Sequence, residues 1–132
     1  MTTGRAQRPS QILHAIALLW VSTSLGLSAA VLGVQRAGGA WDAIAVTVGL
    51  MLIIMSVLTV MVWRGRNWAR ILYVVLVATS LASFVAAWGV AERPPFEVAL
   101  EAVSYVADAG SFFLMFTAPG SSWFTETPEP RA

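Results

Sequence analysis

Residues 43–63 read AIAVTVGLMLIIMSVLTVMVW and contain no charged side chain. A helix that crosses the hydrocarbon core of a bilayer needs about 20 mostly apolar residues, because this core is about 30 Å thick. The stretch meets that length without interruption, so we interpret it as a membrane-spanning helix. Three further stretches satisfy the same criterion and lie at residues 11–34, 68–91 and 98–118. The sequence therefore predicts an all-α, polytopic membrane protein with four transmembrane helices.

The segments that connect these stretches are short and rich in turn-forming residues. Residues 35–39 read QRAGG, residues 64–67 read RGRN, and residues 92–95 read ERPP. Glycine favours tight turns, and consecutive prolines cannot continue a helix. Connections this short join antiparallel neighbours, which predicts an up-down-up-down bundle that forms a single domain. Short tails are expected at residues 1–9 and 119–132, and the Pro-rich end of the second tail is expected to be disordered.

Two of the four stretches admit another interpretation. The last one carries Glu101 and Asp108, and a charged residue at the bilayer centre costs about 2.5–3.5 kcal/mol on the insertion scale. The alternative is three spans followed by an interfacial helix. The first stretch follows a basic lead, as a signal peptide does, but its apolar run is longer than the roughly 7–15 residues of a signal core. We therefore interpret it as an uncleaved helix.

The composition excludes several classes of protein. Of the 132 residues, 58% are hydrophobic and 11% are charged, and the formal net charge is +1. Soluble domains carry about 25% charged residues, so a soluble globular domain and a disordered chain are both excluded. A charge of this size exerts no general attraction on nucleic acid. The chain has no cysteine and no recognisable catalytic motif, so we expect no enzyme activity, no cofactor and no metal site.

Arginines near the ends of the predicted spans indicate their orientation, because cytoplasmic segments hold an excess of basic residues. The first tail and the second connection together hold five arginines, which are Arg5, Arg8, Arg64, Arg66 and Arg70. The other two connections hold one each, Arg36 and Arg93. Both termini are therefore predicted to be cytoplasmic. Trp63 and Trp68 flank the second connection and are expected to anchor it at the membrane interface. The arginines of this connection are expected to set the topology, and the alternative is that they bind anionic lipid headgroups.

Polar side chains gather on one face of the fourth predicted helix. At 100° per residue, five of them fall within a narrow sector, which we call the acidic stripe: Glu97, Glu101, Ser104, Asp108 and Ser111. The opposite face is apolar and suited to lipid. The acidic stripe is therefore expected to face the interior of the bundle or a water-filled path.

Asp108 near the middle of this helix has two interpretations. Desolvation favours its neutral acid, and a neutral Asp108 donates one hydrogen bond that fixes helix packing. Partners expected at matching depth on the third helix are Thr79, Ser80 and Ser83. Alternatively, an intramembrane Asp108 below Glu101 serves a proton or cation relay. We favour the packing interpretation, because no span offers Asp108 a basic partner.

Small residues recur at four-residue spacing and predict close helix contacts. The runs are Ser22-Gly26-Ala30 on the first helix and both Ala78-Ala82-Ala86 and Thr79-Ser83-Ala87 on the third. The function expected from them is that of a structural or accessory subunit that assembles as a homo-oligomer or joins a larger membrane complex. The alternative is a small proton- or cation-coupled transporter that uses the acidic stripe. Because four helices rarely enclose a path, that alternative is expected to require a dimer.

The second connection carries a resemblance to a known group. Residues 65–70 read GRNWAR, which is similar to the G-[KR]-N-W-A-R loop between helices two and three of small four-helix bacterial inner-membrane proteins of unknown function. The Arg8-Pro9 lead-in and the sequence APGSSWF at residues 118–124 resemble the same group. The resemblance implies a multi-pass location in the bacterial inner membrane and four spans. It implies no activity.

Overall fold

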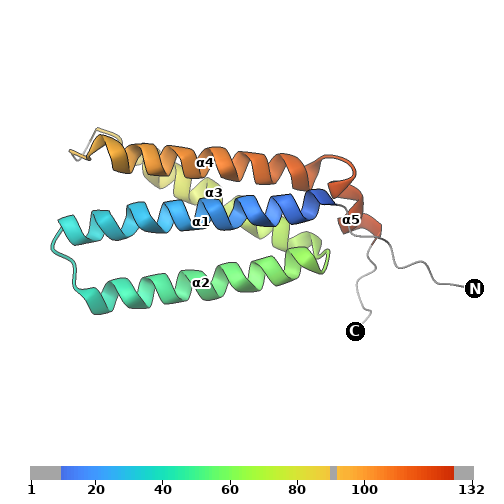
Figure 1. The fold of residues 1–132 in the computed structure, drawn as a ribbon, viewed down its shortest axis with the longest axis horizontal. Coiled ribbons are helices and arrows are strands. Elements are labelled where there is room, and N and C mark those ends of the chain that lie inside the picture. The colour runs from blue at the N-terminus through green and yellow to red at the C-terminus, as the bar shows by residue number, and fades with distance from the viewer. Residues whose placement is uncertain (1–9, 90–91, 127–132) are drawn as a thin grey trace, which may run out of the picture.

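A computed structural model of the chain describes residues 10–89 and 92–126. Its elements are four long helices and one short helix, with no strand among the described residues (Figure 1): α1 (Ser10–Arg36), α2 (Trp41–Trp63), α3 (Asn67–Ala86), α4 (Pro95–Phe116) and α5 (Gly120–Glu126). Helices α1 to α4 are each long and apolar enough to cross a membrane. The prediction of an all-helical chain with four long apolar helices is confirmed.

Successive long helices run in opposite directions, so the bundle has two distinct ends (Figure 1). At one end, which we call the Arg36 end, α1 turns into α2 and α3 leads into α4. At the other, which we call the α5 end, α2 turns into α3 and α5 lies beside the start of α1. Parts of the predicted tails, at residues 1–9 and 127–132, and the predicted end of the third helix at 90–91 lie outside the described residues.

Two of the turns close on glycines whose conformation other residues rarely adopt. Gly38 and Gly65 have φ of 75° and 73°. In each case the next amide bonds back to the last turn of the helix, from Gly39 to the Val34 carbonyl and from Arg66 to the Met61 carbonyl, both at 2.9 Å. This is the pattern of a Schellman motif, which ends a helix sharply. The short connections that the sequence predicted are thus formed by helix caps.

The segment that was predicted as a short tail after the fourth helix, residues 119–132, begins with a further helix, whereas its Pro-rich end at residues 127–132 lies outside the described residues. Residues 120–126 form α5, whose first amide, of Gly120, donates to the side-chain oxygen of Gln11 at 2.9 Å. Phe124 in α5 is buried against the apolar core. The sequence analysis gave no helix to residues 120–126, and the burial of Phe124 is what holds this segment on the bundle.

Helices α1 and α4 form the main interface of the bundle. Both contribute side chains at alternating spacings of three and four residues, which is the spacing of helices that interlock along a seam. On α1 the buried members are Ile12, Ala15, Leu19, Ser22 and Ala29. On α4 the buried members are four of the five residues of the acidic stripe together with Ala107 and Met115, and Glu101, the fifth stripe residue, is half-buried. The stripe therefore faces the interior of the bundle.

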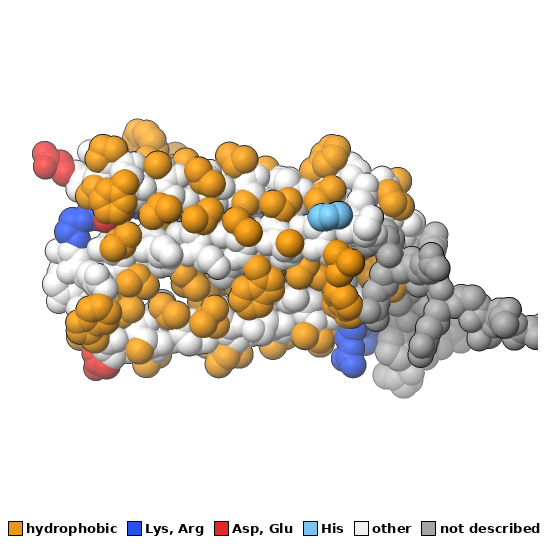
Figure 2. Space-filling model, in the orientation of Figure 1, with side chains coloured by type: hydrophobic (Ala, Val, Ile, Leu, Met, Phe, Trp, Pro, Cys, Tyr) orange, Lys and Arg blue, Asp and Glu red, His pale blue; other side chains and the backbone are white. Residues whose placement is uncertain are grey.

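The two halves of the bundle differ in their filling. Apolar side chains close the α5 end, where α1, α2, α3, α4 and α5 share one core that includes Leu58, Tyr73, Met115 and Phe124. The half toward the Arg36 end is less tightly packed, and most of α3 beyond Tyr73 is exposed or half-buried. On the face drawn in Figure 2 the flank is largely apolar, and charged side chains gather at the two ends. A surface of this kind suits a lipid environment.

Candidate functional site

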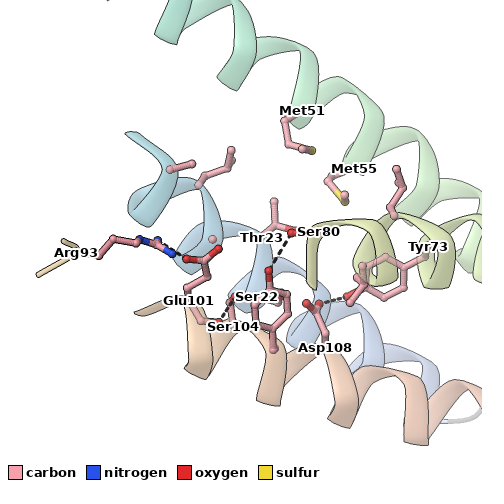
Figure 3. A pocket seen from close by; sticks show the side chains of 16 residues that line it. Ser22, Thr23, Met51, Met55, Tyr73, Ser80, Arg93, Glu101, Ser104 and Asp108 are labelled. Atoms are coloured by element: carbon pink, nitrogen blue, oxygen red, sulfur yellow. Dashed lines mark hydrogen bonds and ion pairs between the residues drawn. The ribbon is translucent and has the colours of Figure 1, made fainter. Parts of the chain in front are cut away.

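A cavity of about 270 Å³ lies between the four long helices, from the middle of the bundle toward the Arg36 end. Its floor along α4 is polar, whereas the walls from α2 and α3 are mainly apolar (Figure 3). The lining includes three members of the acidic stripe, namely Glu101, Ser104 and Asp108. The other lining residues are Ser22, Thr23, Gly26, Leu27, Ala30, Met51, Met55, Tyr73, Leu76, Val77, Ser80, Arg93 and Tyr105.

Asp108 lies at the inner end of this cavity and is only 5% exposed. Its carboxylate accepts a hydrogen bond from the hydroxyl of Tyr73 on α3 (Figure 3). Tyr73 is itself 1% exposed and stands edge-on to the ring of Phe112, with ring centroids 5.0 Å apart. Because its ring is packed on α4, the tyrosine holds its hydroxyl at a fixed place beside the acid.

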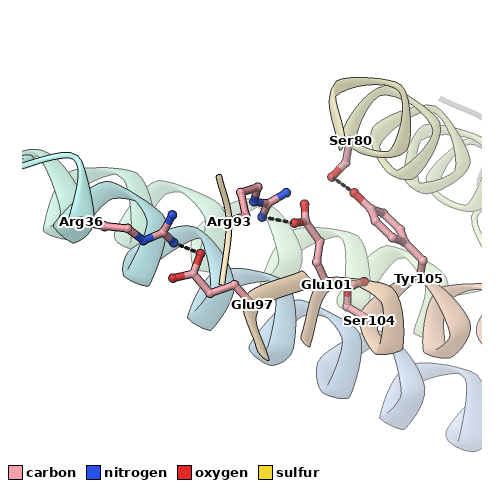
Figure 4. Close-up of polar contacts among 7 residues, drawn as sticks. All are labelled: Arg36, Ser80, Arg93, Glu97, Glu101, Ser104 and Tyr105. Carbon is pink, nitrogen blue, oxygen red and sulfur yellow. Dashed lines mark hydrogen bonds and ion pairs between the residues drawn. The ribbon is translucent and has the colours of Figure 1, made fainter. Parts of the chain in front are cut away.

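The expected hydroxyl partners of Asp108 are placed differently. Thr79 and Ser83 are exposed on α3, and each hydroxyl donates to a backbone carbonyl one turn earlier in its own helix. Ser80 reaches the cavity but exchanges a hydrogen bond of 3.1 Å with the hydroxyl of Tyr105 (Figure 4). The partner of Asp108 is therefore a tyrosine about two to three turns nearer the α5 end than the expected hydroxyls. Sequence reasoning missed it because the relative shift of α3 and α4 along their axes is not encoded in either helix alone.

Glu101 lies one to two turns closer to the Arg36 end and pairs with Arg93 (Figure 4). Arg93 belongs to the non-helical segment before α4, and its side chain reaches along that helix to the carboxylate. The guanidinium carbon also lies 5.5 Å from the centre of the Phe84 ring. Both partners are about one-fifth exposed, with side-chain values of 23% for Arg93 and 20% for Glu101.

Glu97 at the start of α4 forms the outermost ion pair, with Arg36 in the last turn of α1 (Figure 4). The carboxylate side chain is 3% exposed, whereas that of Arg36 is 40% exposed. The remaining stripe hydroxyls also have partners. Ser104 donates to the Glu101 carbonyl at 2.7 Å, and Ser111 donates across the seam to the Ala15 carbonyl at 3.0 Å. Each side chain of the acidic stripe thus has a partner inside the bundle.

The residues around the second connection that were predicted to set topology lie at the α5 end, whereas Arg5 and Arg8 lie outside the described residues. Arg64 and Trp68 are exposed, Trp68 by 43%, and Trp63 and Arg66 are half-buried. Arg70 departs from the expected surface position. Its guanidinium carbon lies 4.8 Å from the ring centres of both Phe116 and Phe124. This residue therefore joins α3 to α4 and α5 through cation–π contacts, which a desolvated setting strengthens.

The arrangement has the chemistry of a cation site. Two carboxylates, two phenols, four further hydroxyls and the guanidinium of Arg93 line the cavity together with aliphatic and thioether side chains. Within residues 10–89 and 92–126, no cluster of three or more His, Cys, Asp or Glu side chains could hold a metal ion. Hard divalent cations prefer six or more oxygen ligands, so the described side chains suit a proton or a singly charged cation better.

Tyr73, Tyr105 and Arg93 are site residues that sequence reasoning did not assign to the site. A tyrosine within an apolar span is a signal that could have singled out Tyr73, because its hydroxyl requires a partner in a low-dielectric interior. Arg93 gave no such signal, since an arginine between two spans fits a role in topology equally well.

In the comparisons with known proteins, no family model, no curated protein and no solved structure matches the chain.

Proposed function

We propose that this chain is a multi-pass membrane protein that takes a small cation into its interior cavity and acts as a small proton- or cation-coupled transporter. The observation that carries the proposal is the position of Asp108 and Glu101 on the wall of a cavity that all four long helices surround. A helix pair that needed polar residues only for packing would leave no space beside them. Here a single copy of the chain provides the cavity, so the proposal does not depend on a dimer.

The polar groups suit such a role because each acid has a partner that a cation or proton can replace. Tyr73 donates to Asp108, and Arg93 neutralises Glu101. Acids held inside a membrane protein are costly and usually serve ion or proton pathways. A proton or cation that enters beside Asp108 meets a carboxylate whose partner is an uncharged phenol, so the opposite charges compensate each other and the cost of placing the cation there falls.

Asp108→Asn is expected to reduce proton-coupled uptake of benzamidine, a small organic cation, at least about tenfold, because the amide cannot exchange a proton. The assay uses the purified protein in liposomes that contain a pH-sensitive dye and an imposed benzamidine gradient. Asp42→Asn is the matched control, since Asp42 is exposed at the start of α2 and does not line the cavity. Undiminished uptake by Asp108→Asn, or wild-type uptake no faster than in empty liposomes, contradicts the proposal.

We further propose that both termini are cytoplasmic and that the membrane is the bacterial inner membrane. The support is the excess of arginines near the α5 end over Arg36 and Arg93, together with the GRNWAR sequence at residues 65–70. Reporter fusions after residue 38 and after residue 132 are expected to show periplasmic and cytoplasmic activity, respectively. A periplasmic carboxyl end would instead support three spans and an interfacial helix.

A second candidate function, that of an accessory subunit, is favoured by the surface of α3. The runs of small residues on this helix are exposed: Ala78, Thr79, Ala82, Ser83, Ala86 and Ala87. The corresponding run on α1 is used within the chain, because Ser22 is buried and a Cβ at Gly26 would lie 3.8 Å from the Ser104 hydroxyl oxygen. A self-associating protein would therefore use α3, and its mass in detergent would exceed that of one chain.

A further inference from the structure

The segment that leads into α4 places a cation at the mouth of the cavity. The guanidinium of Arg93 is paired with Glu101 and lies over the face of Phe84. Phe84 in turn contacts the rings of Trp88 and Tyr105, with centroid distances of 5.2 Å and 5.5 Å. One carboxylate and the face of one aromatic ring, itself supported by two further rings, therefore hold a single planar cation, and cation–π contact of this kind also recognises organic cations.

Arg93 is also the residue shared by two cavities. It lines the main cavity of about 270 Å³ and a smaller one of about 180 Å³ that Trp88 and Val98 help to line. Its side chain comes from a non-helical segment between α3 and α4, so it is not fixed by the backbone of either helix. If the side chain moved from Glu101 into the smaller cavity, it would leave the carboxylate and the Phe84 ring facing the main cavity.

We infer that Arg93 occupies a binding subsite for an organic cation, and that the ligand is a planar amidinium or guanidinium group with a small apolar body. This inference rests on the proposed function and specifies its substrate class. The charged group replaces the guanidinium of Arg93 on Glu101 and Phe84. The apolar body lies against the side chains of Met51, Met55 and Leu76 that form the opposite wall. Sites for small ligands usually combine apolar walls with a few placed polar groups in this way.

The size of the cavity agrees with this class of ligand. Pockets for drug-sized ligands measure about 300–1,000 Å³, and the main cavity lies just below that range. An inorganic ion would leave most of this volume without contacts, whereas a ligand with one ring would cover the apolar wall. A neutral ligand of the same shape that displaced Arg93 would leave the Glu101 carboxylate without a positive partner. An unpaired charge in a desolvated site is costly.

Benzamidine is a suitable probe because it carries a planar amidinium on one ring, and benzamide is its neutral counterpart. In titrations of the purified full-length protein in detergent, wild type is expected to bind benzamidine at least about tenfold more tightly than benzamide. Glu101→Gln is expected to abolish the difference. Arg93→Gln is expected to bind benzamidine about tenfold more tightly than wild type. If Arg93 occupies the subsite in about nine of ten wild-type molecules, only about one in ten is free to bind, and the apparent affinity of wild type is weakened about tenfold.

Arg64→Gln is the matched control, since it removes the same charge from an exposed position at the α5 end, and unchanged affinity is expected. A second readout needs no substitution in the site. Benzamidine is expected to increase labelling of Arg93 by phenylglyoxal in wild type, since the ligand displaces the side chain from Glu101. This measurement decides the question if Arg93→Gln does not fold.

The outcomes separate the two proposals. If benzamidine and benzamide bind equally, or Glu101→Gln binds as wild type does, the cation site itself fails and the proposed function fails with it. A different result would overturn only the inference about Arg93. In that result benzamidine binding requires Glu101, but Arg93→Gln binds benzamidine no more tightly than wild type, and benzamidine lowers the labelling of Arg93. In that case Arg93 covers the ligand and does not compete with it.

Discussion

Replacing Arg36 with alanine is expected to lower the free energy of unfolding by about 2–3 kcal/mol. The substitution leaves Glu97, with a side chain 3% exposed, as a buried carboxylate without its partner. Breaking a buried ion pair from one side costs about 3–5 kcal/mol, and we expect a smaller value here because the Arg36 side chain is 40% exposed and solvent weakens the pair. The loss also loosens the seam between α1 and α4 at the Arg36 end.

Thermal and denaturant unfolding in detergent, followed by the fluorescence of the six tryptophans, measures this effect. The double variant Arg36→Ala/Glu97→Gln is expected to recover most of the stability, because a neutral amide costs less to bury than a carboxylate. Arg64→Ala is the control and should change stability by about 0.5 kcal/mol or less, as is usual for an exposed position. An Arg36→Ala protein as stable as wild type would show that the pair contributes nothing to the bundle.

Ala15→Leu is expected to destabilise the bundle by about 1–3 kcal/mol, the usual cost of forcing added methylenes into a packed core. Ala15 is fully buried in the seam, and its carbonyl accepts the hydrogen bond of Ser111 at 3.0 Å. The larger side chain would separate α1 from α4 and stretch that bond. The approach is already close nearby, since a Cβ at Gly110 would lie 3.1 Å from the Cδ1 atom of Leu18. The same unfolding assay measures the effect.

Ala82→Leu makes the same chemical change on the exposed surface of α3. Its free energy of unfolding is expected to match that of wild type, so an equal loss of stability in Ala15→Leu and Ala82→Leu would contradict a seam between α1 and α4.

Ala82→Leu also tests the second candidate function. If the detergent-solubilised protein is larger than one chain and Ala82→Leu reduces it to a single chain, the exposed face of α3 is an interface. A wild type of one chain mass that also co-purifies with no native partner contradicts the accessory-subunit function.

The acidic stripe shows how far the sequence alone could predict the site. The periodicity of α4 predicted that the five residues of the acidic stripe would share an inward face; four of them are buried, and Glu101 is half-buried. It also predicted an apolar outer face, where Val106 is 72% exposed. The partners were not predictable in the same way. Arg36, Arg93 and Tyr73 lie on other helices or connections, and nothing in the spacing within α4 identifies them.

Two features of the fold depend on surfaces that meet only in the folded chain. The run Ser22-Gly26-Ala30 was predicted to make close helix contacts, and in the structure Ser22 is buried and Gly26 lies near Ser104 of α4 in the same chain. Residues 120–126 looked like a solvated tail, but Phe124 is buried and Arg70 lies over its ring. Both outcomes depend on which surfaces meet, and the sequence of one segment leaves that open.

The sequence by itself determined the four long apolar helices, their turns and the face on which α4 carries its polar groups. These features are local, because hydropathy adds up along a segment and the helical repeat fixes which side chains share a face. The tertiary structure alone decided which groups pair with the acids and that a cavity remains beside them. Those features depend on how each helix is rotated and shifted against its neighbours. That arrangement is set by packing between residues far apart in the chain, such as Tyr73 with Asp108 and Arg36 with Glu97.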